Sequence, residues 1–170
     1  IWVRNSVSLL RTEPDGPGRL ITLTEDITAR KKAEEDLAQQ VRDFETLLEV
    51  IPVGIAVSED PECTRMRANR ALEEVLGVEM GRDISKTTAA GASLPFRLLR
   101  DGQVIPPDEL PMQLAAREGI EVRGFEIDVI REDGRVVHQF GHAVPLLDER
   151  GTVRGSIGVF VDMTERKRAE

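Results

Sequence analysis

Cysteine is nearly missing from this sequence of 170 residues, because Cys63 is the only one. A single cysteine permits no internal disulfide, which favours a reducing compartment, so we expect a cytoplasmic location. Long hydrophobic runs are missing as well: none approaches the roughly 20 apolar residues that a membrane-spanning helix needs. We therefore expect no direct membrane contact in this segment, although a parent protein can be anchored elsewhere. The absence of an initiator methionine and of a signal peptide indicates an internal cut from a longer chain.

Positive charge is outnumbered by negative charge. The sequence has 23 Lys and Arg against 31 Asp and Glu, which gives a net charge of −8. This balance argues against a nucleic-acid partner and against attraction to an anionic membrane surface. Catalytic motifs are missing too, since the sequence has no P-loop, G-x-G-x-x-G, H-E-x-x-H or G-x-S-x-G. We predict that the segment itself is not an enzyme and has no catalytic residues.

The sequence contains one motif in two similar copies. DITARKKAEE begins at Asp26, and DMTERKRAE begins 136 residues later at Asp162. Each copy follows an apolar, β-branched run and then becomes helix-favouring, which predicts a joint where a strand ends and a helix begins. In each copy an Arg follows the Asp by four residues, a spacing that permits an ion pair across the first turn. The predicted joint residues are Asp26, Thr28, Arg30, Asp162, Thr164 and Arg166.

The similarity extends upstream of both joints, where WVRNSVSLL resembles VVHQFGHAVPLL. Residues 1–28 are therefore interpreted as the tail of one repeat unit, and residues 136–164 as the tail of the next. Residues 165–170 then begin an outgoing helix.

The segment 29–51 has a heptad pattern. Its apolar residues are spaced 4-3-4-3 and are separated by charged and amide residues. These seam residues are Leu37, Val41, Phe44, Leu48 and Ile51. Pro52 should end the helix, because the residue before a proline avoids the helical region. We predict a linker helix that pairs with a second copy as a coiled coil in a homodimer; the alternative is an amphipathic helix lying on its own domain.

The rest of the chain predicts an α+β domain. A short strand starts at Val53, and the stretch from Cys63 to Gly77 is predicted to be a strand followed by a helix, with Asn69 as its N-cap and Gly77 just after its end. Residues 78–108 are predicted to form a loop with a short helical turn. A helix follows that Asp108 could cap and that ends at Gly119. Three antiparallel strands complete the domain, with turns at Asp133-Gly134 and Arg150-Gly151.

Several of these stretches together resemble a PAS domain over residues 52–164. They are ANRALEEVLG, PMQLAAREG, REDGR, PLLDERG and the closing DMTERKRAE. The resemblance implies a PAS fold: an antiparallel sheet of about five strands with helices on one face, preceded by the long linker helix. It also implies that residues 1–28 are the last two strands of a preceding PAS domain.

The resemblance implies a sensory or relay module of a multidomain bacterial signalling protein. A sensor histidine kinase of a two-component system is the first candidate for the parent protein, and a diguanylate cyclase is the second. A signal would pass through the Asp162–Thr164 joint into the outgoing helix and on to adjacent PAS or output domains. The competing interpretation is a structural dimerisation spacer with a filled core and no ligand.

Alternation along the last three strands places one face toward the core. By resemblance, this face lines the ligand cavity of the family. The predicted pocket residues are Phe125, Ile127, Val129, Gln139, Gly141, Gly158 and Phe160. Gln139 is then a polar group among apolar ones, bonded to a backbone carbonyl, to water or to a ligand.

The opposite face is also apolar and needs a cover, either residues 44–51 or a partner subunit. Its residues are His138, Phe140, Ile157, Val159 and Val161.

The sequence argues against the cofactors of related branches. The flavin-binding branch has a cysteine motif that is missing here. That branch also has amide side chains at three strand positions, which correspond here to Val129, Gln139 and Phe160, and only Gln139 is an amide. Haem-binding members use a histidine of the long helix, and residues 108–119 contain none. His138 and His142 would lie about 13 Å apart on one strand, too far for one metal ion. We predict no flavin, haem or metal and leave open an unknown small-molecule ligand.

Overall fold

A computed structural model describes residues 1–10 and 19–169. The chain divides into two compact units, Ile1–Leu47 and Leu48–Glu170. Each unit is described by itself below.

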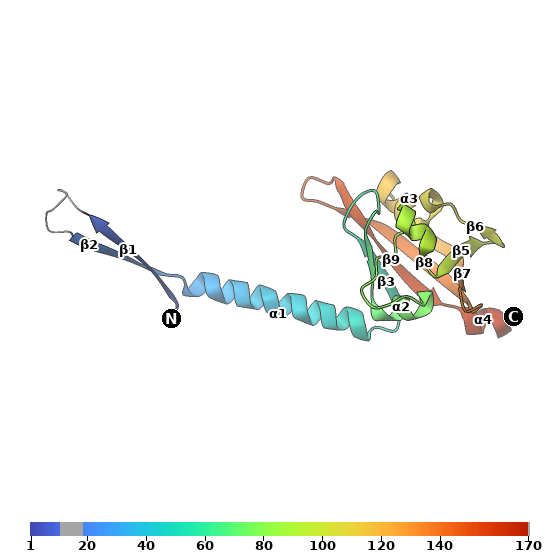
Figure 1. The fold of residues 1–170 in the computed structure, drawn as a ribbon, viewed down its shortest axis with the longest axis horizontal. Helices are drawn as coiled ribbons and strands as arrows, with labels where there is room; N and C mark the ends of the chain where they lie inside the picture. Colours follow the sequence, from blue (N-terminus) through green and yellow to red (C-terminus); the bar gives the residue numbers. More distant parts are fainter. Residues whose placement is uncertain (11–18, 170) are drawn as a thin grey trace. The chain divides into compact units, whose positions relative to one another are not determined.

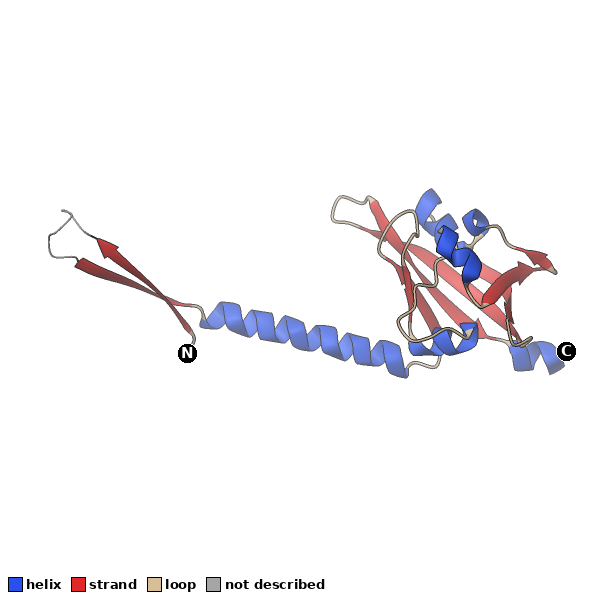
Figure 2. Ribbon diagram, viewed as in Figure 1, coloured by secondary structure: helices blue, strands red, loops and turns tan. Residues whose placement is uncertain are grey.

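The first unit contains a hairpin and most of a long helix (Figures 1 and 2). Strands β1 (Val3–Leu10) and β2 (Arg19–Asp26) pair antiparallel, and α1 (Thr28–Val50) follows β2 directly. With 23 residues, α1 is about 35 Å long. None of its residues is buried. The predicted strands and helix are present, and the segment between the two strands lies outside the described residues.

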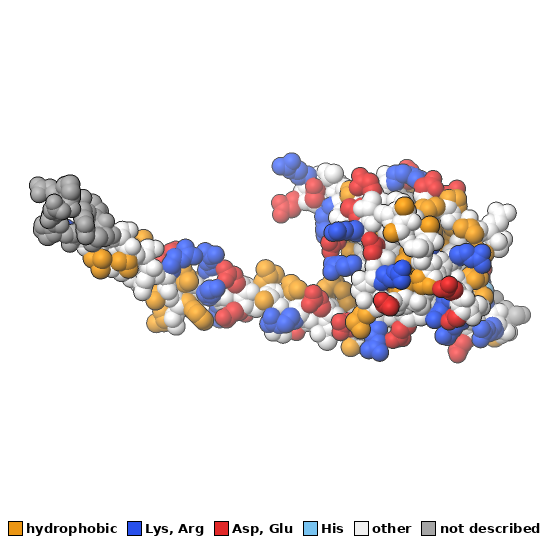
Figure 3. All heavy atoms as spheres, viewed as in Figure 1, with side chains coloured by type: hydrophobic (Ala, Val, Ile, Leu, Met, Phe, Trp, Pro, Cys, Tyr) orange, Lys and Arg blue, Asp and Glu red, His pale blue; other side chains and the backbone are white. Residues whose placement is uncertain are grey.

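The predicted seam of α1 is largely exposed. Leu37 is 62% exposed, Val41 49% and Phe44 58%, while Leu48 is half-buried. Figure 3 shows apolar side chains exposed along this helix among charged ones. The helix ends at Val50, one residue before Ile51, because Pro52 restricts Ile51 to extended backbone. Ile51 was predicted as a seam residue of this helix, but it lies one residue beyond the helix end.

The second unit is built on a seven-stranded antiparallel sheet in the order β4-β3-β9-β8-β7-β5-β6. The strands are β3 (Gly54–Ser58), β4 (Met66–Ala68), β5 (Phe96–Arg100), β6 (Gln103–Val104), β7 (Val122–Arg131), β8 (Val136–Leu147) and β9 (Val153–Asp162). Buried and exposed residues alternate along β7 and β8, so one face of the sheet forms the core.

Helices cover the core face of this sheet. Helix α3 (Pro111–Glu118) packs against β7, β8 and β9, and α2 (Arg70–Leu76) packs against β3. Asn69 caps α2 as predicted, since its side-chain oxygen accepts a hydrogen bond from Leu72 N at 3.1 Å. Gly77 follows with φ +69°, the left-handed conformation that favours glycine after a helix. The last element, α4 (Thr164–Ala169), leaves the end of β9.

The structure confirms the predicted α+β fold, with an antiparallel sheet that carries helices on its core face, and corrects some details. The sheet has seven strands rather than about five, because β5 and β6 form within residues 78–108, where a loop was predicted. This region also contains two short 3-10 helices, η1 (Ala89–Ser93) and η2 (Pro107–Glu109). Asp108 does not cap α3: it lies in η2, and the N-cap of α3 is Leu110.

Candidate functional site

A small cavity lies between the core face of the sheet and the helices. It has a volume of about 50 Å³ and is lined mainly by apolar side chains from the sheet, α2, α3 and the segment before β5. Three polar side chains share this lining: Lys86, Gln113 and Gln139. Pockets for drug-sized ligands are usually several hundred Å³. The cavity as it stands has room only for a molecule of a few non-hydrogen atoms.

All seven predicted pocket residues are buried. Ile127, Gln139 and Phe160 line the cavity directly. The other four belong to the core around it and are Phe125, Val129, Gly141 and Gly158. Alternation together with the PAS resemblance thus selected the buried face but not which of its residues touch the cavity.

Phe160 limits the size of the cavity. A Cβ atom added at Gly141 would lie 2.7 Å from Cδ1 of the Phe160 ring, and one added at Gly158 would lie 2.8 Å from Cε2. Real Cβ atoms do not come so close to other atoms, so the ring lies where only glycine leaves space. The two glycines allow Phe160 to fill the centre of the core face.

Gln139 is a polar residue of the cavity wall whose amide nitrogen is not satisfied by the interior. Its side chain is 5% exposed, and its Nε2 is buried without a hydrogen-bond partner among the described residues. An unsatisfied buried donor costs about 1–3 kcal/mol. The sequence analysis left three partners open for the Gln139 side chain: a backbone carbonyl, water or a ligand. Among the described residues, no backbone carbonyl bonds its Nε2.

Lys86 supplies a cation at the same cavity. Its Nζ donates hydrogen bonds to the backbone oxygens of Phe96 (2.7 Å) and Gly91 (3.0 Å) and lies 4.3 Å from the centre of the Phe96 ring. Burial lowers the pKa of this ammonium, because desolvation disfavours the charged form. Nearby, Gln113 Nε2 donates to Thr87 Oγ1 at 3.2 Å. The sequence prediction missed Lys86 and Gln113.

The second predicted joint ties α4 to strand β8. Asp162 Oδ1 accepts a hydrogen bond from Thr164 N at 2.8 Å, and Thr164 Oγ1 accepts one from His138 N at 3.0 Å. Met163 N donates to His138 O at 2.7 Å. The backbone of His138 is therefore held on both sides by the joint. The next residue along β8 is Gln139, whose side chain enters the cavity.

The first joint repeats this pattern. Asp26 Oδ1 accepts from Thr28 N, Thr28 Oγ1 accepts from Trp2 N, and Ile27 N donates to Trp2 O, each at 2.9 Å. The hydrogen bonds from Thr28 lower the pKa of the Asp26 carboxyl. Trp2 precedes His138 by the same 136 residues that separate the two Asp residues.

The strand register repeats as well. The eight residue pairs of β1 and β2, from Val3↔Asp26 to Leu10↔Arg19, correspond one by one to pairs of β8 and β9, from Gln139↔Asp162 to Leu146↔Gly155. Every residue number differs by 136. The hairpin at the start of the chain thus has the same pairing as the final hairpin of the domain.

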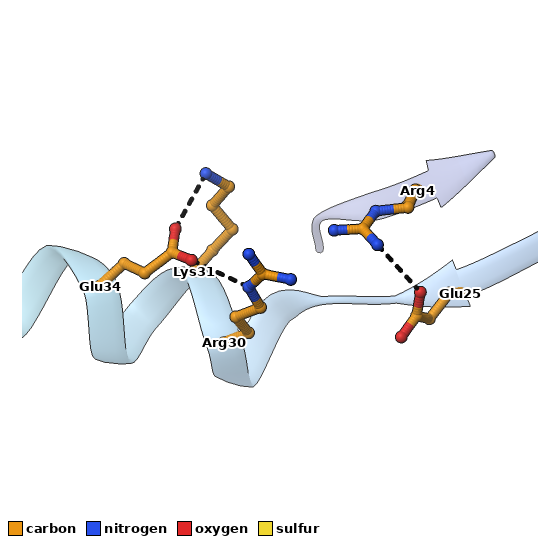
Figure 4. A network of polar contacts seen from close by, with 5 residues as sticks. All are labelled: Arg4, Glu25, Arg30, Lys31 and Glu34. Carbon is orange, nitrogen blue, oxygen red and sulfur yellow. Dashed lines mark hydrogen bonds and ion pairs between the residues drawn. The ribbon is translucent and has the colours of Figure 1, made fainter. Parts of the chain in front are cut away.

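The ion pair that the spacing permits between Asp26 and Arg30 is not formed. Arg30 Nε instead bonds Glu34 Oε1 at 2.9 Å, and Lys31 Nζ bonds Glu34 Oε2 at 3.1 Å (Figure 4). These three side chains are solvent-exposed, so water and salt screen both ion pairs and they add little to stability. The joint depends on its Asp and Thr hydrogen bonds rather than on the Arg30 charge. Arg166, the counterpart of Arg30, lies on α4.

The outer face of the sheet is apolar and partly open, as its pattern predicts. Phe140 is 43% exposed, Val161 41% and Val159 39%, and His138 and Ile157 are half-buried. The covers expected for this face, residues 44–51 or a partner subunit, stay predictions.

Both histidines pair with carboxylates. His138 Nδ1 lies 2.5 Å from Asp128 Oδ1, and His142 Nε2 lies 3.1 Å from Glu121 Oε1. Across residues 1–10 and 19–169, no cluster of three His, Cys, Asp or Glu is arranged to hold a metal ion. Nor does any helix of this part of the chain have the length and apolar character for a membrane crossing.

The family model described as PAS fold matches residues 48–168. Solved structures with similar folds include the PAS domain of an HTR-like protein from Haloarcula marismortui, with 23% identity, TM-score 0.54, and 78% of this chain and 98% of that chain covered. The PAS domain of Bordetella pertussis BvgS is 23% identical, with TM-score 0.51 and coverage of 80% and 94%.

An RNA-binding light-oxygen-voltage receptor is 19% identical, with TM-score 0.55; the match covers 98% of this chain and 40% of that one. At these identities the similarity concerns the fold. No curated protein matches the chain.

Proposed function

This chain belongs to the PAS-fold family, and we propose that it is a sensory relay module that passes the state of its cavity to the helix leaving its C-terminal end. The observation that carries the proposal is the position of His138. Its backbone is held by Met163 and Thr164, and its neighbour Gln139 contributes the unsatisfied amide of the cavity. A displacement of Gln139 therefore acts directly on His138, the adjacent residue, whose backbone is hydrogen-bonded to the joint.

The mechanism is a shift between two populations. An occupant that bonds the Gln139 amide favours one position of β8, and an empty or water-filled cavity favours another. The joint converts this difference into a different orientation or stability of α4, from which adjacent PAS or output domains read it. Only an occupant with different affinities for the two states shifts the balance.

We propose that the parent protein is a sensor histidine kinase of a two-component system, with a diguanylate cyclase as the alternative, and that this segment lies in the cytoplasm. Residues 1–28 would be the last two strands of a preceding PAS domain. The identical register of the two hairpins and the identical hydrogen bonds of the two joints support this assignment. The chain would then be a link in a serial array, paired with a second copy through α1.

The alternative function is a structural dimerisation spacer without a ligand. The small cavity and the Phe160 ring that fills its neighbourhood favour it. The spacer and the relay differ in one respect: in a spacer, a change in the cavity has no effect on α4.

This difference can be measured by amide hydrogen exchange. Replacing Gln139 with leucine fills the same space and removes the unsatisfied donor. In a relay, Gln139→Leu should change exchange at residues 162–169, and Thr164→Val should abolish that dependence because it removes the acceptor for His138 N. By itself, Thr164→Val should speed exchange of the His138 amide about fivefold, since one hydrogen bond contributes about 1 kcal/mol.

The matched control is Thr152→Val, which removes the same hydroxyl from an exposed turn at the other end of β9. It should leave exchange at His138 and α4 unchanged. Equal exchange of α4 in the parent chain and in Gln139→Leu would favour the spacer.

We also expect the purified protein to be colourless. A cavity of about 50 Å³ is far smaller than a flavin or a haem requires. A visible absorption spectrum of freshly purified protein checks this expectation, and a stoichiometric absorption band would contradict it.

A further inference from the structure

Asn69 uses every hydrogen-bonding position of its side chain. Its Nδ2 donates to the backbone oxygens of Leu48 and Val53, each at 2.9 Å. Its Oδ1 accepts hydrogen bonds from Ile55 N at 2.9 Å and from Leu72 N at 3.1 Å. An asparagine amide has two N–H donors and an oxygen with two lone pairs, so this side chain is saturated. Capping α2 requires only the bond to Leu72 N, whereas the other three bonds reach parts of the chain 14 to 21 residues earlier.

One of these bonds holds the end of α1. Leu48 lies in the last turn of α1 and is the first residue of the second unit. The last four carbonyl groups of a helix have no partner inside the helix, so a donor from outside fixes the position of the helix end. Asn69 Nδ2 is such a donor for Leu48 O. The Leu48 side chain is also half-buried, so the last turn of α1 is attached to the domain.

Asn69 is bonded to β3 by its backbone as well as by its side chain. Asn69 N donates to Ile55 O at 2.9 Å, in addition to the bond from Ile55 N to its Oδ1. Strand β3 pairs with β9, where Ile55 lies opposite Val159. Strand β9 ends at Asp162, whose carboxylate accepts the hydrogen bond from Thr164 N at the start of α4. Asn69 and two paired strands therefore connect the last turn of α1 to α4.

We infer that Asn69 is a positioning residue that transmits movements of the last turn of α1 to the sheet, and through the sheet to α4. The domain then has a second input, one that does not use the cavity. Because Asn69 is bonded to α1, β3 and α2 at once, the helix end cannot shift without breaking one of these hydrogen bonds or moving β3. The inference goes beyond the proposed cavity relay, because a domain with an inert cavity would still respond in this way.

The test loosens the end of α1 by a single methyl group and measures amide hydrogen exchange at the joint. Glu45→Ala and Glu45→Gly remove the same exposed carboxylate, and glycine is up to about fivefold less favourable than alanine inside a helix. The readout is the amide of Met163, which donates to His138 O. Exchange of this amide should be about two- to fivefold faster in Glu45→Gly than in Glu45→Ala, since the response cannot exceed the perturbation.

Asn69→Ser tests the residue itself. Serine is also a good N-cap, so this substitution keeps the cap of α2 and removes the two donors of the amide. In the Asn69→Ser background, Glu45→Gly and Glu45→Ala should give equal exchange at Met163. A merely structural role would lower the stability of both chains and leave the ratio of their exchange rates unchanged.

Ala38→Gly is the matched control for the loosened helix. It removes the same methyl group from α1 one heptad before position 45, away from the attached turn. Exchange at Met163 should then be the same as in the parent chain. An effect equal to that of Glu45→Gly would overturn the inference, because a general weakening of α1 would be its cause.

A second amide keeps the test decisive should Asn69→Ser fail to fold, which circular dichroism shows. Ile55 N donates to Asn69 Oδ1, so its exchange should rise together with that of Met163 in Glu45→Gly. Unchanged exchange at Ile55 or at Met163 overturns the inference, and so does a difference at Met163 that persists in Asn69→Ser. The cavity relay is judged separately, by the substitution inside the cavity.

Discussion

Replacing Phe160 with alanine is expected to lower the free energy of unfolding by about 3–5 kcal/mol, the usual cost of deleting a buried aromatic ring. Phe160 is 8% exposed and belongs to the main hydrophobic cluster. Glycines at positions 141 and 158 leave space for its ring and provide no side chain to fill the gap. The core therefore cannot easily collapse around the smaller residue. Urea unfolding of the parent chain and the variant measures the difference.

Phe140→Ala is the matched control for this experiment. Phe140 lies on β8, in register with Val161 of β9, but points to the outer face and is 43% exposed. In a chain whose outer face is open to solvent, its loss should cost less than about 1 kcal/mol. If Phe140→Ala costs as much as Phe160→Ala, the outer face is covered in solution, and the assignment of Phe160 as the principal aromatic residue of the core is contradicted.

The same variant distinguishes the two proposed functions in a second way. Phe160→Ala adds the volume of a phenyl ring beside a cavity of about 50 Å³. Such a gap is dry when its lining is apolar and can accept a small apolar molecule. A relay whose output follows the state of the cavity should then show altered exchange at α4, whereas a spacer should show only reduced stability.

The sequence predicted the second half of the domain well because its signals there are local. Buried residues recur at alternate positions over Phe125–Val129 of β7 and Val137–Ala143 of β8, and Asp133-Gly134 is a strong hairpin signal. Asn69 and Gly77 bounded α2 because capping depends on single residues and their immediate neighbours. Alternation separated the two faces of each strand, and the PAS resemblance indicated which face lines the cavity; all seven pocket residues selected in this way are in the interior.

The segment between α2 and α3 was harder to predict. Strand β5 has five residues and β6 only two, so neither shows a period. One signal was present: Asp101-Gly102 separates the two strands, and both residues have positive φ, as in a two-residue hairpin turn. Lys86 gave no such signal. Its place at the cavity depends on the path of the loop, which brings Gly91 O and Phe96 O within reach of its ammonium.

Arg30 shows a limit of predicting ion pairs from sequence spacing. A spacing of four residues permits two pairs on a helix, with Asp26 before it or Glu34 after it. Asp26 instead accepts the hydrogen bond from Thr28 N that begins α1, which leaves Glu34 for Arg30. Sequence spacing identifies the candidates, and competition from the backbone decides between them.

The second large effect is expected in the association of the chain. Three seam residues of α1, Leu37, Val41 and Phe44, expose apolar side chains on a helix that has no buried residue. A single helix of 23 residues gains little stability in water from its backbone alone. Pairing with a second copy would bury this seam, with Leu37 and Phe44 at equivalent heptad positions.

If the chain pairs through this seam as predicted, the double substitution Leu37→Asp and Phe44→Asp should convert the predicted dimer to a monomer. Each aspartate would place an unpaired charge in the seam, where desolvation is costly. Sedimentation velocity at micromolar concentration should show a mass near that of one chain for this variant and a mass near that of two chains for the parent.

The control is Gln39→Asp with Thr46→Asp, which adds the same two charges to the same helix. These positions lie two residues beyond Leu37 and Phe44, on the side of the helix turned away from the seam. This variant should sediment with the parent chain as a dimer. If the seam variant also remains a dimer, α1 is not the interface, and the amphipathic alternative or pairing through the outer face of the sheet takes its place. If both variants dissociate, the added charge rather than the seam is responsible, and the coiled-coil assignment fails.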